Sequence, residues 1–536
     1  MGNALFSPPP PVNEPVYMYS PGSPEKQAVK ATLKELQDQQ ADIPLVIGSQ
    51  KIIDRPTEDL TSPQNHSRVL AKFRQATADD INQAISAATK VGPEWAALPW
   101  NERAAVFLKT ADLIATKYRP IMNATTLLGQ GKTIFQAEID AACELIDFLR
   151  YNVAYAHQIY SQQPYSSHGV WNRSEARGLE GFVFAVGPFN FTAISGNLAA
   201  SPALMGTPVI WKPASTALLS SYMFYQIMEE AGLPPGVINL VTGDPKVIGA
   251  TCLASEHLSG IHFTGSTGTF NYLWQEVGKN IGRYNCYPRV VGETGGKDFI
   301  FAHPSADPEQ LVTAMVRGSF EFQGQKCSAA SRAYIPASLW NEVKKDLVDR
   351  TNSLPMGDPE DFTNFMGAVI DERAFAKIKG YIDHAKSAKN ANVIAGGECD
   401  DSKGYFIRPT VIETTDPHYQ SMVEEIFGPV LTIFVYQDAD LEKTVELCDT
   451  STPYALTGAV FARGRDEIHT LTHALSGAAG NFYINDKPTG AVVGQQPFGG
   501  GRKSGTNDKA GSIYNLLRWV SHRTLKENFL PIVDHN

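Results

Sequence analysis

Five short apolar runs decide the fold: GFVFAV (181–186), PVIWKP (208–213), VINLVTG (237–243), GIHFTG (260–265) and RVVGET (289–294). Helix-compatible segments separate them, and the one over 217–231 is followed by Gly232 and Pro234, which commonly stop a helix. Strands that recur after helices and are apolar throughout indicate a parallel sheet covered on both faces. The stretch therefore predicts a doubly wound α/β domain of the nucleotide-binding kind, with any ligand at the carboxyl ends of its strands.

The flanking sequence adds further units. Apolar residues recur at helical spacing from about 77 to 160, and a second strand–helix series runs from about 298 to 500. A chain of 536 residues is too long for one core, so two or three lobes are expected. The polar stretch from Tyr160 to Gly181 is either a hairpin arm that reaches another subunit or a surface loop. Residues 1–25 are rich in proline and predict an extended, poorly ordered arm.

Composition and charge exclude several classes of protein. The net charge is −10, with 43% hydrophobic and 19% charged residues, which is typical of a globular protein that phosphate backbones would repel. The six scattered cysteines form no CxxC pair, which argues against a disulfide framework and a thiolate zinc site. No run is apolar for long enough to span a bilayer. The first residues resemble neither a signal peptide nor a transit peptide, so we expect a cytoplasmic protein or a targeting segment outside this sequence.

Two glycine-bearing segments are candidates for phosphate sites. The usual GxGxxG is absent, but the strand GIHFTG runs into Ser266, Thr267, Gly268 and Thr269 and then a helix, whose N-terminal N–H groups could bind a pyrophosphate or be plainly capped. Lys212, at the end of PVIWKP, could bind ribose hydroxyls or be solvated. The segment 129–133 (GQGKT) lacks the further glycine and the preceding strand of a P-loop, so we reject that interpretation.

Three residues are candidates for chemistry. Cys327 follows a helical pattern and a glycine turn, where Lys326 and free N–H groups would favour its thiolate. Glu293 ends an apolar strand, where partial burial would raise the pKa of a general base, although it could also lie in solvent. Asn190 could donate an amide to an oxyanion or serve as a turn residue or helix cap. No metal-ligand cluster accompanies them.

Seven motifs together resemble the aldehyde dehydrogenase superfamily, and they occur in that family's order over nearly the whole chain. They are PFN (188–190), WKP (211–213), FTGS (263–266), GETGGK (292–297), GQKCS (324–328), EEIFGP (424–429) and PFGG (497–500). The resemblance implies the α/β aldehyde dehydrogenase fold. Its parts would be an extended arm (1–25), an NAD-binding domain (26–159 and 182–292), a catalytic domain (293–502) and an oligomerisation arm with β structure (160–181 and 503–536).

The family's mechanism is implied for the matching residues. Cys327 would attack the aldehyde, Asn190 and the Cys327 N–H would hold the oxyanion, and Glu293 would activate the water that hydrolyses the thioester. The implied cofactor contacts are Lys212, Gly265, Ser266, Thr267, Gly268, Thr269, Glu425, Phe427 and Gly187, although Gly187 replaces a serine seen in some members. NAD is the expected cofactor by family habit. NADP is the alternative, because Ser215 offers no carboxylate to reject a 2′-phosphate.

Within this superfamily, three segments (138–152, 178–193 and 481–498) resemble the Δ1-pyrroline-5-carboxylate dehydrogenase branch. That resemblance implies oxidation of glutamate γ-semialdehyde to glutamate in proline breakdown. The implied substrate contacts are Ser328, Gly490, Ala491, Phe191, Phe498 and Glu144. Ala491 stands where some members have serine, so backbone N–H groups of the 489–492 loop must bind the substrate carboxylate.

The same resemblance implies a homodimer or higher homo-oligomer and the mitochondrial matrix. The sequence leaves two alternatives open: a dehydrogenase for another small aldehyde, and a non-catalytic structural member of the family. The second would be expected to lack the nucleophile or the base, and Cys327, Glu293 and Asn190 are all present.

Overall fold

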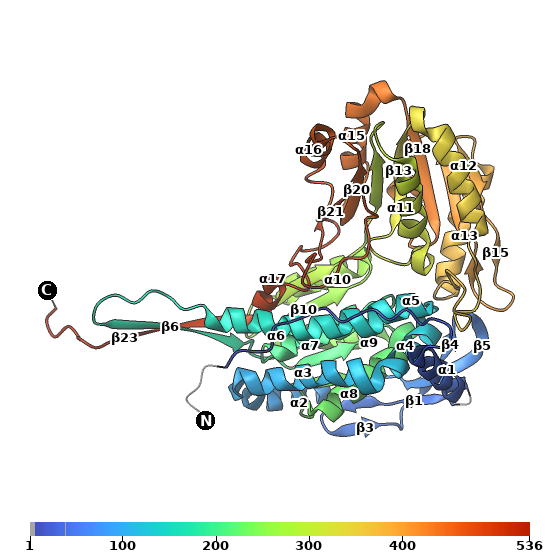
Figure 1. Cartoon of the computed structure of the whole chain (residues 1–536). Helices are drawn as coiled ribbons and strands as arrows, with labels where there is room; N and C mark the ends of the chain where they lie inside the picture. The colour runs from blue at the N-terminus through green and yellow to red at the C-terminus, as the bar shows by residue number, and fades with distance from the viewer. Residues whose placement is uncertain (1–5, 38, 536) are drawn as a thin grey trace.

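The computed structural model describes residues 6–37 and 39–535, arranged as two lobes, each built on a seven-stranded sheet, with a two-stranded arm that projects from the first lobe (Figure 1). Residues 1–5 and 536, at the ends of the two predicted arms, lie outside this description. The mixed α/β architecture predicted from the sequence is confirmed.

The first sheet consists mainly of the five predicted strands. They are β7 (Phe182–Val186), β8 (Val209–Lys212), β9 (Ile238–Leu240), β10 (Leu258–Thr264) and β11 (Arg289–Glu293), all mutually parallel. The sheet order is β11-β10-β7-β8-β9-β2-β3, so the direction of winding reverses between β7 and β10. Such a switch point is where open α/β sheets bind ligands. β2 (Leu45–Ile47) and β3 (Gln50–Ile52) extend the edge in antiparallel fashion and were not predicted.

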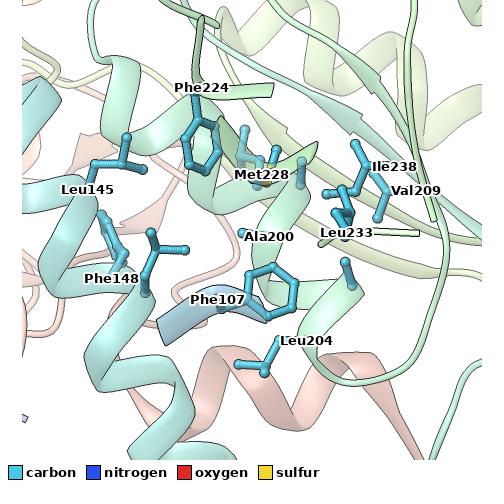
Figure 2. Close-up of a cluster of buried hydrophobic side chains, with 14 of the residues drawn as sticks. Phe107, Leu145, Phe148, Ala200, Leu204, Val209, Phe224, Met228, Leu233 and Ile238 are labelled. Atoms are coloured by element: carbon cyan, nitrogen blue, oxygen red, sulfur yellow. The ribbon is translucent and has the colours of Figure 1, made fainter. Parts of the chain in front are cut away.

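Helices cover both faces of this sheet. They are α1 (Pro24–Gln37), α2 (Ala78–Ala97), α3 (Trp100–Leu113), α4 (Arg119–Gln130), α5 (Ile134–Ala137), α6 (Leu145–Ser161), α7 (Thr192–Leu204), α8 (Leu218–Ala231), α9 (Pro245–Ala254) and α10 (Thr267–Asn280). Two π-helical turns interrupt the series, η1 (Ile114–Tyr118) and η2 (Glu138–Glu144). α8 ends at Gly232 with φ of +106°, as its sequence predicted. The largest core cluster lies between α3, α6, α7 and α8, where Phe107, Leu145 and Phe224 are buried (Figure 2).

The second sheet has the order β14-β17-β18-β13-β12-β20-β21 and is parallel except for β14. Its strands are β12 (Asp298–Ala302), β13 (Ala330–Pro336), β14 (Ala391–Ala395), β17 (Thr410–Thr414), β18 (Val430–Tyr436), β20 (Thr457–Phe461) and β21 (Asn481–Ile484). Its helices are α11 (Pro308–Phe320), α12 (Ala337–Ser353), α13 (Glu372–Ser387), α14 (Gln420–Val423), α15 (Leu441–Thr450) and α16 (Arg465–Ala474). The predicted second strand–helix series is thus confirmed.

The arm pairs two distant segments. β6 (Val170–Gly178) and β23 (Val520–Asn528) form an antiparallel ribbon that extends away from both lobes (Figure 1). The short helix α17 (Ile513–Leu516) precedes β23 and packs on α6. A separate three-stranded sheet of β1 (Ala41–Ile43), β4 (Thr57–Ser62) and β5 (Asn65–Arg74) lies beside α4 and was missed from the sequence. The remaining pairs, β15 (Cys399–Asp400) with β16 (Phe406–Ile407) and β19 (Tyr454–Ala455) with β22 (Gly501–Arg502), are short.

Candidate active site

Cys327 lies in a sharply turned segment between α11 and β13. The single turn η4 (Glu321–Gly324) contains Phe322, Gln323 and Gly324 with φ of +51°, +55° and +64°. A Cβ at Gly324 would overlap the Gly428 carbonyl, so only glycine fits there. Cys327 itself is partly exposed. The turn therefore presents its thiol at the beginning of β13.

The predicted thiolate-stabilising role of Lys326 is wrong. Its ammonium lies 3.1 Å from Glu321 Oε2, which engages the charge in a buried ion pair. The pKa of Cys327 is instead raised well above its usual value, first by burial and then by the charges of Asp298 and Glu293. The resting thiol is therefore protonated, and its reaction with an electrophile requires a base.

Asn190 is held directly against the cysteine turn. It follows β7, is 3% exposed, and its Nδ2 donates to the Gln325 carbonyl at 3.0 Å. An amide nitrogen has two N–H groups, so one fixes the side chain and the second can serve as a donor to a ligand. The structure thus brings Asn190 and Cys327 together across the two lobes.

The segment around Asn190 is fixed by an ion pair that sequence reasoning missed. Asp140 accepts N–H bonds from Thr192 and Ala193 at the start of α7 and pairs with the fully buried Lys132 at 2.5 Å. The Lys132 ammonium also lies 4.1 Å from the centroid of the Phe191 ring. The rejected P-loop segment supplies this lysine. Gly131 caps α4 in a left-handed conformation, so the segment follows a helix rather than a strand.

Glu293 ends β11, as predicted, and its carboxylate lies against glycines. The Gly500 N–H donates to Oε2 at 3.3 Å, and a Cβ at Gly499 would lie 2.9 Å from Oε1. Burial raises the pKa of Glu293 well above its usual value, while Gly500 and Lys509 oppose that shift. The carboxyl is therefore a stronger base than a solvated glutamate. Its charge also acts on the Cys327 thiol.

Glu425 and Phe427 precede β18 and lie next to the turn that carries Cys327. The Gly296 N–H donates to Glu425 Oε1 at 3.0 Å, and burial raises the pKa of Glu425. The Phe427 ring lies 5.7 Å from that of Phe189, edge to face. The motif EEIFGP thus contacts Phe189, which precedes Asn190, and Gly296, three residues after Glu293.

The carboxyl end of β8 holds a buried cation. Lys212 is 7% exposed, its ammonium donates to the Pro213 carbonyl at 3.2 Å, and burial lowers its pKa to about 8. The two remaining N–H groups suit ribose hydroxyls, so the site fits a dinucleotide. Gly187, at the end of β7, would overlap Ser195 Oγ if it carried a Cβ. That contact explains why a serine at 187 does not fit this chain.

The turn after β10 begins α10. Ser266 caps the helix, and its Oγ accepts the Thr269 N–H at 3.2 Å. The 14-residue helix presents its positive end at the switch point of the sheet, and Gly268 has open space around its α-carbon. Gly265, Ser266, Thr267, Gly268 and Thr269 thus meet Lys212 and Gly187 at one edge, as a dinucleotide site requires.

The residues expected to bind substrate lie on two sides of Cys327. Ser328 Oγ and Thr489 Oγ1 are 2.7 Å apart, which joins the cysteine turn to the loop containing Gly490 and Ala491. The ring of Phe191 packs edge to face on Phe322, 6.4 Å away. Phe498 is half-buried beyond that loop, and its backbone pairs with Ala510.

Glu144 ends the π-helical turn η2 on the other side. Burial and the nearby charge of Asp140 raise its pKa to about 8. Its charge acts on the Cys327 thiol, so the structure brings Glu144 into the same region. Within residues 6–37 and 39–535, no cluster of three or more metal-ligating side chains exists, and no helix is long and apolar enough to cross a membrane.

This geometry agrees with the sequence comparisons. The profile described as the aldehyde dehydrogenase family matches residues 53–525. The chain belongs to the aldehyde dehydrogenase family. Among its relatives in the family, it is 53% identical to the mitochondrial Δ1-pyrroline-5-carboxylate dehydrogenase of Dictyostelium discoideum over 527 residues, covering 98% of this chain and 94% of that protein. The human protein of the same name is 49% identical over 523 residues (97% and 93%).

Solved structures of other aldehyde dehydrogenases give the same result. The Δ-pyrroline-5-carboxylate dehydrogenase of Mycobacterium tuberculosis bound with NAD superposes with a TM-score of 0.97 at 53% identity, covering 100% of this chain and 99% of that one. The 1-pyrroline-5-carboxylate dehydrogenase from Thermus with bound NAD gives 0.91 at 30% identity, covering 98% and 100%. The predicted fold class, family and resemblance to this branch are confirmed.

Proposed function

We propose that this chain is an NAD-dependent Δ1-pyrroline-5-carboxylate dehydrogenase that oxidises L-glutamate γ-semialdehyde to L-glutamate, the second step of proline degradation. The observation that carries the proposal is the convergence of Cys327, Asn190 and Glu293 from separate segments, with Asn190 bonded to the cysteine turn at 3.0 Å. Relatives about 50% identical over nearly the full chain carry the name of this activity.

NAD fits the switch-point edge of the first sheet. Lys212 would bind a ribose, the N-terminus of α10 the pyrophosphate, and Glu425 the ribose nearer the reacting end. When bound, the nicotinamide ring accepts the hydride that leaves the substrate carbon. The Mycobacterium tuberculosis relative was crystallised with NAD, which supports NAD over NADP.

The first chemical step belongs to the cysteine turn. Cys327 Sγ adds to the aldehyde carbon, and the thiol proton is released to solvent water. The free N–H of Asn190 and the backbone N–H of Cys327 would hold the oxyanion, each contributing about 3 kcal/mol. Loss of hydride then leaves a thioester on Cys327.

The second step is hydrolysis, and the Glu293 carboxylate is the base, for which its raised pKa suits it. It removes a proton from water as the oxygen attacks the thioester carbon, and the C–S bond breaks to release the acid and the Cys327 thiol. An enzyme that transferred the acyl group to another thiol would not need this carboxylate. Its burial against glycines therefore favours a dehydrogenase that releases a free acid.

Substrate recognition is assigned to the loop joined to Ser328. The backbone N–H groups of Gly490 and Ala491 would bind the substrate carboxylate, with the Ser328 hydroxyl in support. Phe191 and Phe498 would pack against the aliphatic part, and Glu144 would lie near the substrate end. The relatives' names support a mitochondrial location, and the projecting β6–β23 ribbon supports assembly into a dimer or higher oligomer through the predicted arms (160–181 and 503–536).

The test is a substrate panel with the purified protein. We expect kcat/KM for glutamate γ-semialdehyde to exceed that for propanal and for succinic semialdehyde by at least about 100-fold. Only glutamate γ-semialdehyde would both place its carboxylate on the 489–492 loop and fill the space beside Phe191 and Phe498 with its aliphatic chain. NAD should be preferred to NADP in the same assay. Equal specificity constants across the three aldehydes would contradict the substrate, and no NADH from any aldehyde would contradict the activity.

A further inference from the structure

Asn13, far from the catalytic residues in sequence, joins the two lobes beside the proposed substrate loop. Its Nδ2 donates to Asp147 at 2.7 Å and to the Val493 carbonyl at 2.8 Å. Its Oδ1 accepts from Tyr151 at 3.2 Å and from Gln495 at 3.0 Å. An amide side chain can make two bonds of each kind, so every bonding position of Asn13 is used.

These contacts connect one helix to one loop. Asp147 and Tyr151 lie on α6, one turn apart, whereas Val493 and Gln495 follow Gly490 and Ala491 in the substrate loop. The loop is already close to α6, because a Cβ at Gly494 would overlap the Tyr151 ring. Asn13 is thus the polar bridge at the contact between them.

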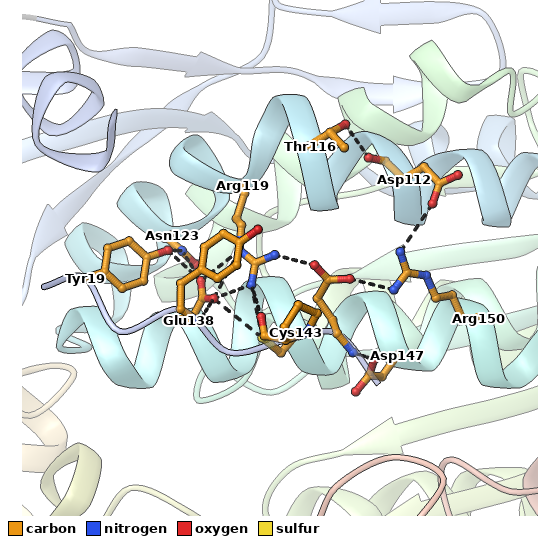
Figure 3. Close-up of polar contacts among 12 residues, drawn as sticks. Tyr19, Asp112, Thr116, Arg119, Asn123, Glu138, Cys143, Asp147 and Arg150 are labelled. Atoms are coloured by element: carbon orange, nitrogen blue, oxygen red, sulfur yellow. Dashed lines mark hydrogen bonds and ion pairs between the residues drawn. The ribbon is translucent and has the colours of Figure 1, made fainter. Parts of the chain in front are cut away.

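The segment that carries Asn13 is itself firmly attached, so the expectation of a poorly ordered arm is wrong for these residues. We call residues 13–19 the N-terminal strap. Glu14 pairs with Arg119 at 2.5 Å and Arg150 at 2.7 Å, and its N–H donates to Asp147 at 2.7 Å (Figure 3).

At the other end of the strap, the hydroxyl of Tyr19 donates to the fully buried Glu138 at 2.7 Å, and the N–H of Tyr17 donates to the same carboxylate at 2.9 Å. Figure 3 shows Tyr19 and Glu138 at one end of this polar network and Asp147 and Arg150 at the other. The strap is therefore fastened at the first residue of the π-helical turn, Glu138, and just beyond its end, at Asp147.

We propose that the N-terminal strap is a specificity-determining element, in which Asn13 is a positioning residue that holds the loop 489–496 in the conformation that binds a carboxylate-bearing aldehyde. The inference rests on the proposed function of that loop. A carboxylate bound by backbone N–H groups requires a fixed loop conformation, and ordering a free loop at each binding event would cost affinity. Residues 13 and 14 supply that order in advance.

The experiment compares Asn13→Ala with the unaltered full-length protein on two aldehydes. The KM for glutamate γ-semialdehyde should rise about tenfold, as expected for losing a small set of hydrogen bonds, with kcat changed less than about twofold. The KM for propanal, which has no carboxylate, should stay the same. Gln495→Ala should give a smaller rise, and the double variant should add little to Asn13→Ala, because both remove the same bridge.

A matched control is Val12→Ala, next to Asn13 and 69% exposed, which should leave both KM values unchanged. Hydrogen exchange of the 489–496 segment gives a second measurement that is independent of the substrate, and it should be faster in Asn13→Ala. Unchanged exchange, or equal rises in KM for the two aldehydes, would overturn the positioning role. An unaltered enzyme that prefers propanal, with exchange still accelerated in the variant, would overturn the proposed substrate alone.

Discussion

The two seven-stranded sheets contribute to the site through opposite ends of their parallel strands. In the first sheet, Lys212 and Glu293 stand at the carboxyl ends of β8 and β11, and Asn190 follows the carboxyl end of β7. In the second sheet, Cys327 precedes the amino end of β13 and Glu425 precedes that of β18. Both sheets are largely parallel and helix-covered, yet only the first obeys the rule that ligands bind at carboxyl ends.

The two sheets therefore contribute different kinds of groups to the site. The first sheet offers helix N-termini and strand-end side chains, which suit a dinucleotide. The second sheet offers the turns that enter its strands, and one of these carries the nucleophile. Variants of Cys327 on the second sheet should therefore fail in bond making, and variants of Glu293 and Lys212 on the first sheet should fail in hydrolysis and cofactor binding.

The largest effect is expected on the second sheet. Cys327→Ala should lower the rate of NADH formation by about 10⁴-fold or more, because the covalent route is lost. NAD binding, measured by calorimetry, should be unchanged, since Cys327 makes none of the proposed dinucleotide contacts. Cys399→Ala, another partly exposed cysteine, is the matched control and should retain full activity. Normal turnover in Cys327→Ala would refute the mechanism.

Glu293→Gln should be the next most severe and should separate the two steps. Turnover should fall by about 10²–10⁴-fold, while acylation continues and the acyl-enzyme appears as a mass increase on the intact protein. In the unaltered enzyme, hydrolysis should rise with pH, because the raised pKa keeps Glu293 protonated to a higher pH than a solvated glutamate. That rise should vanish in Glu293→Gln. Full hydrolysis in the variant, with the exposed Glu256→Gln as the control, would place the base elsewhere.

The smallest effect is expected from Lys212→Met, which keeps the apolar stem and removes the charge. The KM for NAD should rise about tenfold with little change in acylation of saturated enzyme. Because burial lowers the pKa of Lys212 to about 8, NAD affinity of the unaltered enzyme should weaken above that pH as the ammonium is lost. The variant should show no such step. An equal loss in the exposed Lys279→Met would show that general charge, rather than this site, is responsible.

Strand patterns predicted the residues of the first sheet, whereas a glycine turn only suggested Cys327 and the family resemblance then supported it. Apolar runs placed Lys212 and Glu293 at strand ends, because a parallel, doubly wound sheet aligns its carboxyl ends. No such rule reaches Cys327, whose position depends on three consecutive residues with positive φ, two of them not glycine.

The partners of buried charges were equally hidden in the sequence. Lys326 pairs with Glu321 instead of the thiol, and Lys132 pairs with Asp140. The ion-pair partner of each lysine depends on tertiary packing, which the local sequence does not specify. β1, β2 and β3 were missed because each has only three residues, and the longer β4 and β5 were missed because their burial does not alternate regularly.

The glycines around Glu293 limit which natural variants this enzyme can carry. Alanine at Gly499, Gly500 or Gly505 would bring a methyl group within 2.9 Å, 2.8 Å and 2.5 Å of neighbouring oxygen or carbon atoms, one of them on the base itself. Single-nucleotide changes at these codons should therefore be purged from populations, even though they add only one carbon. At Gly249 and Gly278, where the added carbon meets nothing within 4 Å, the same change should persist as a neutral polymorphism.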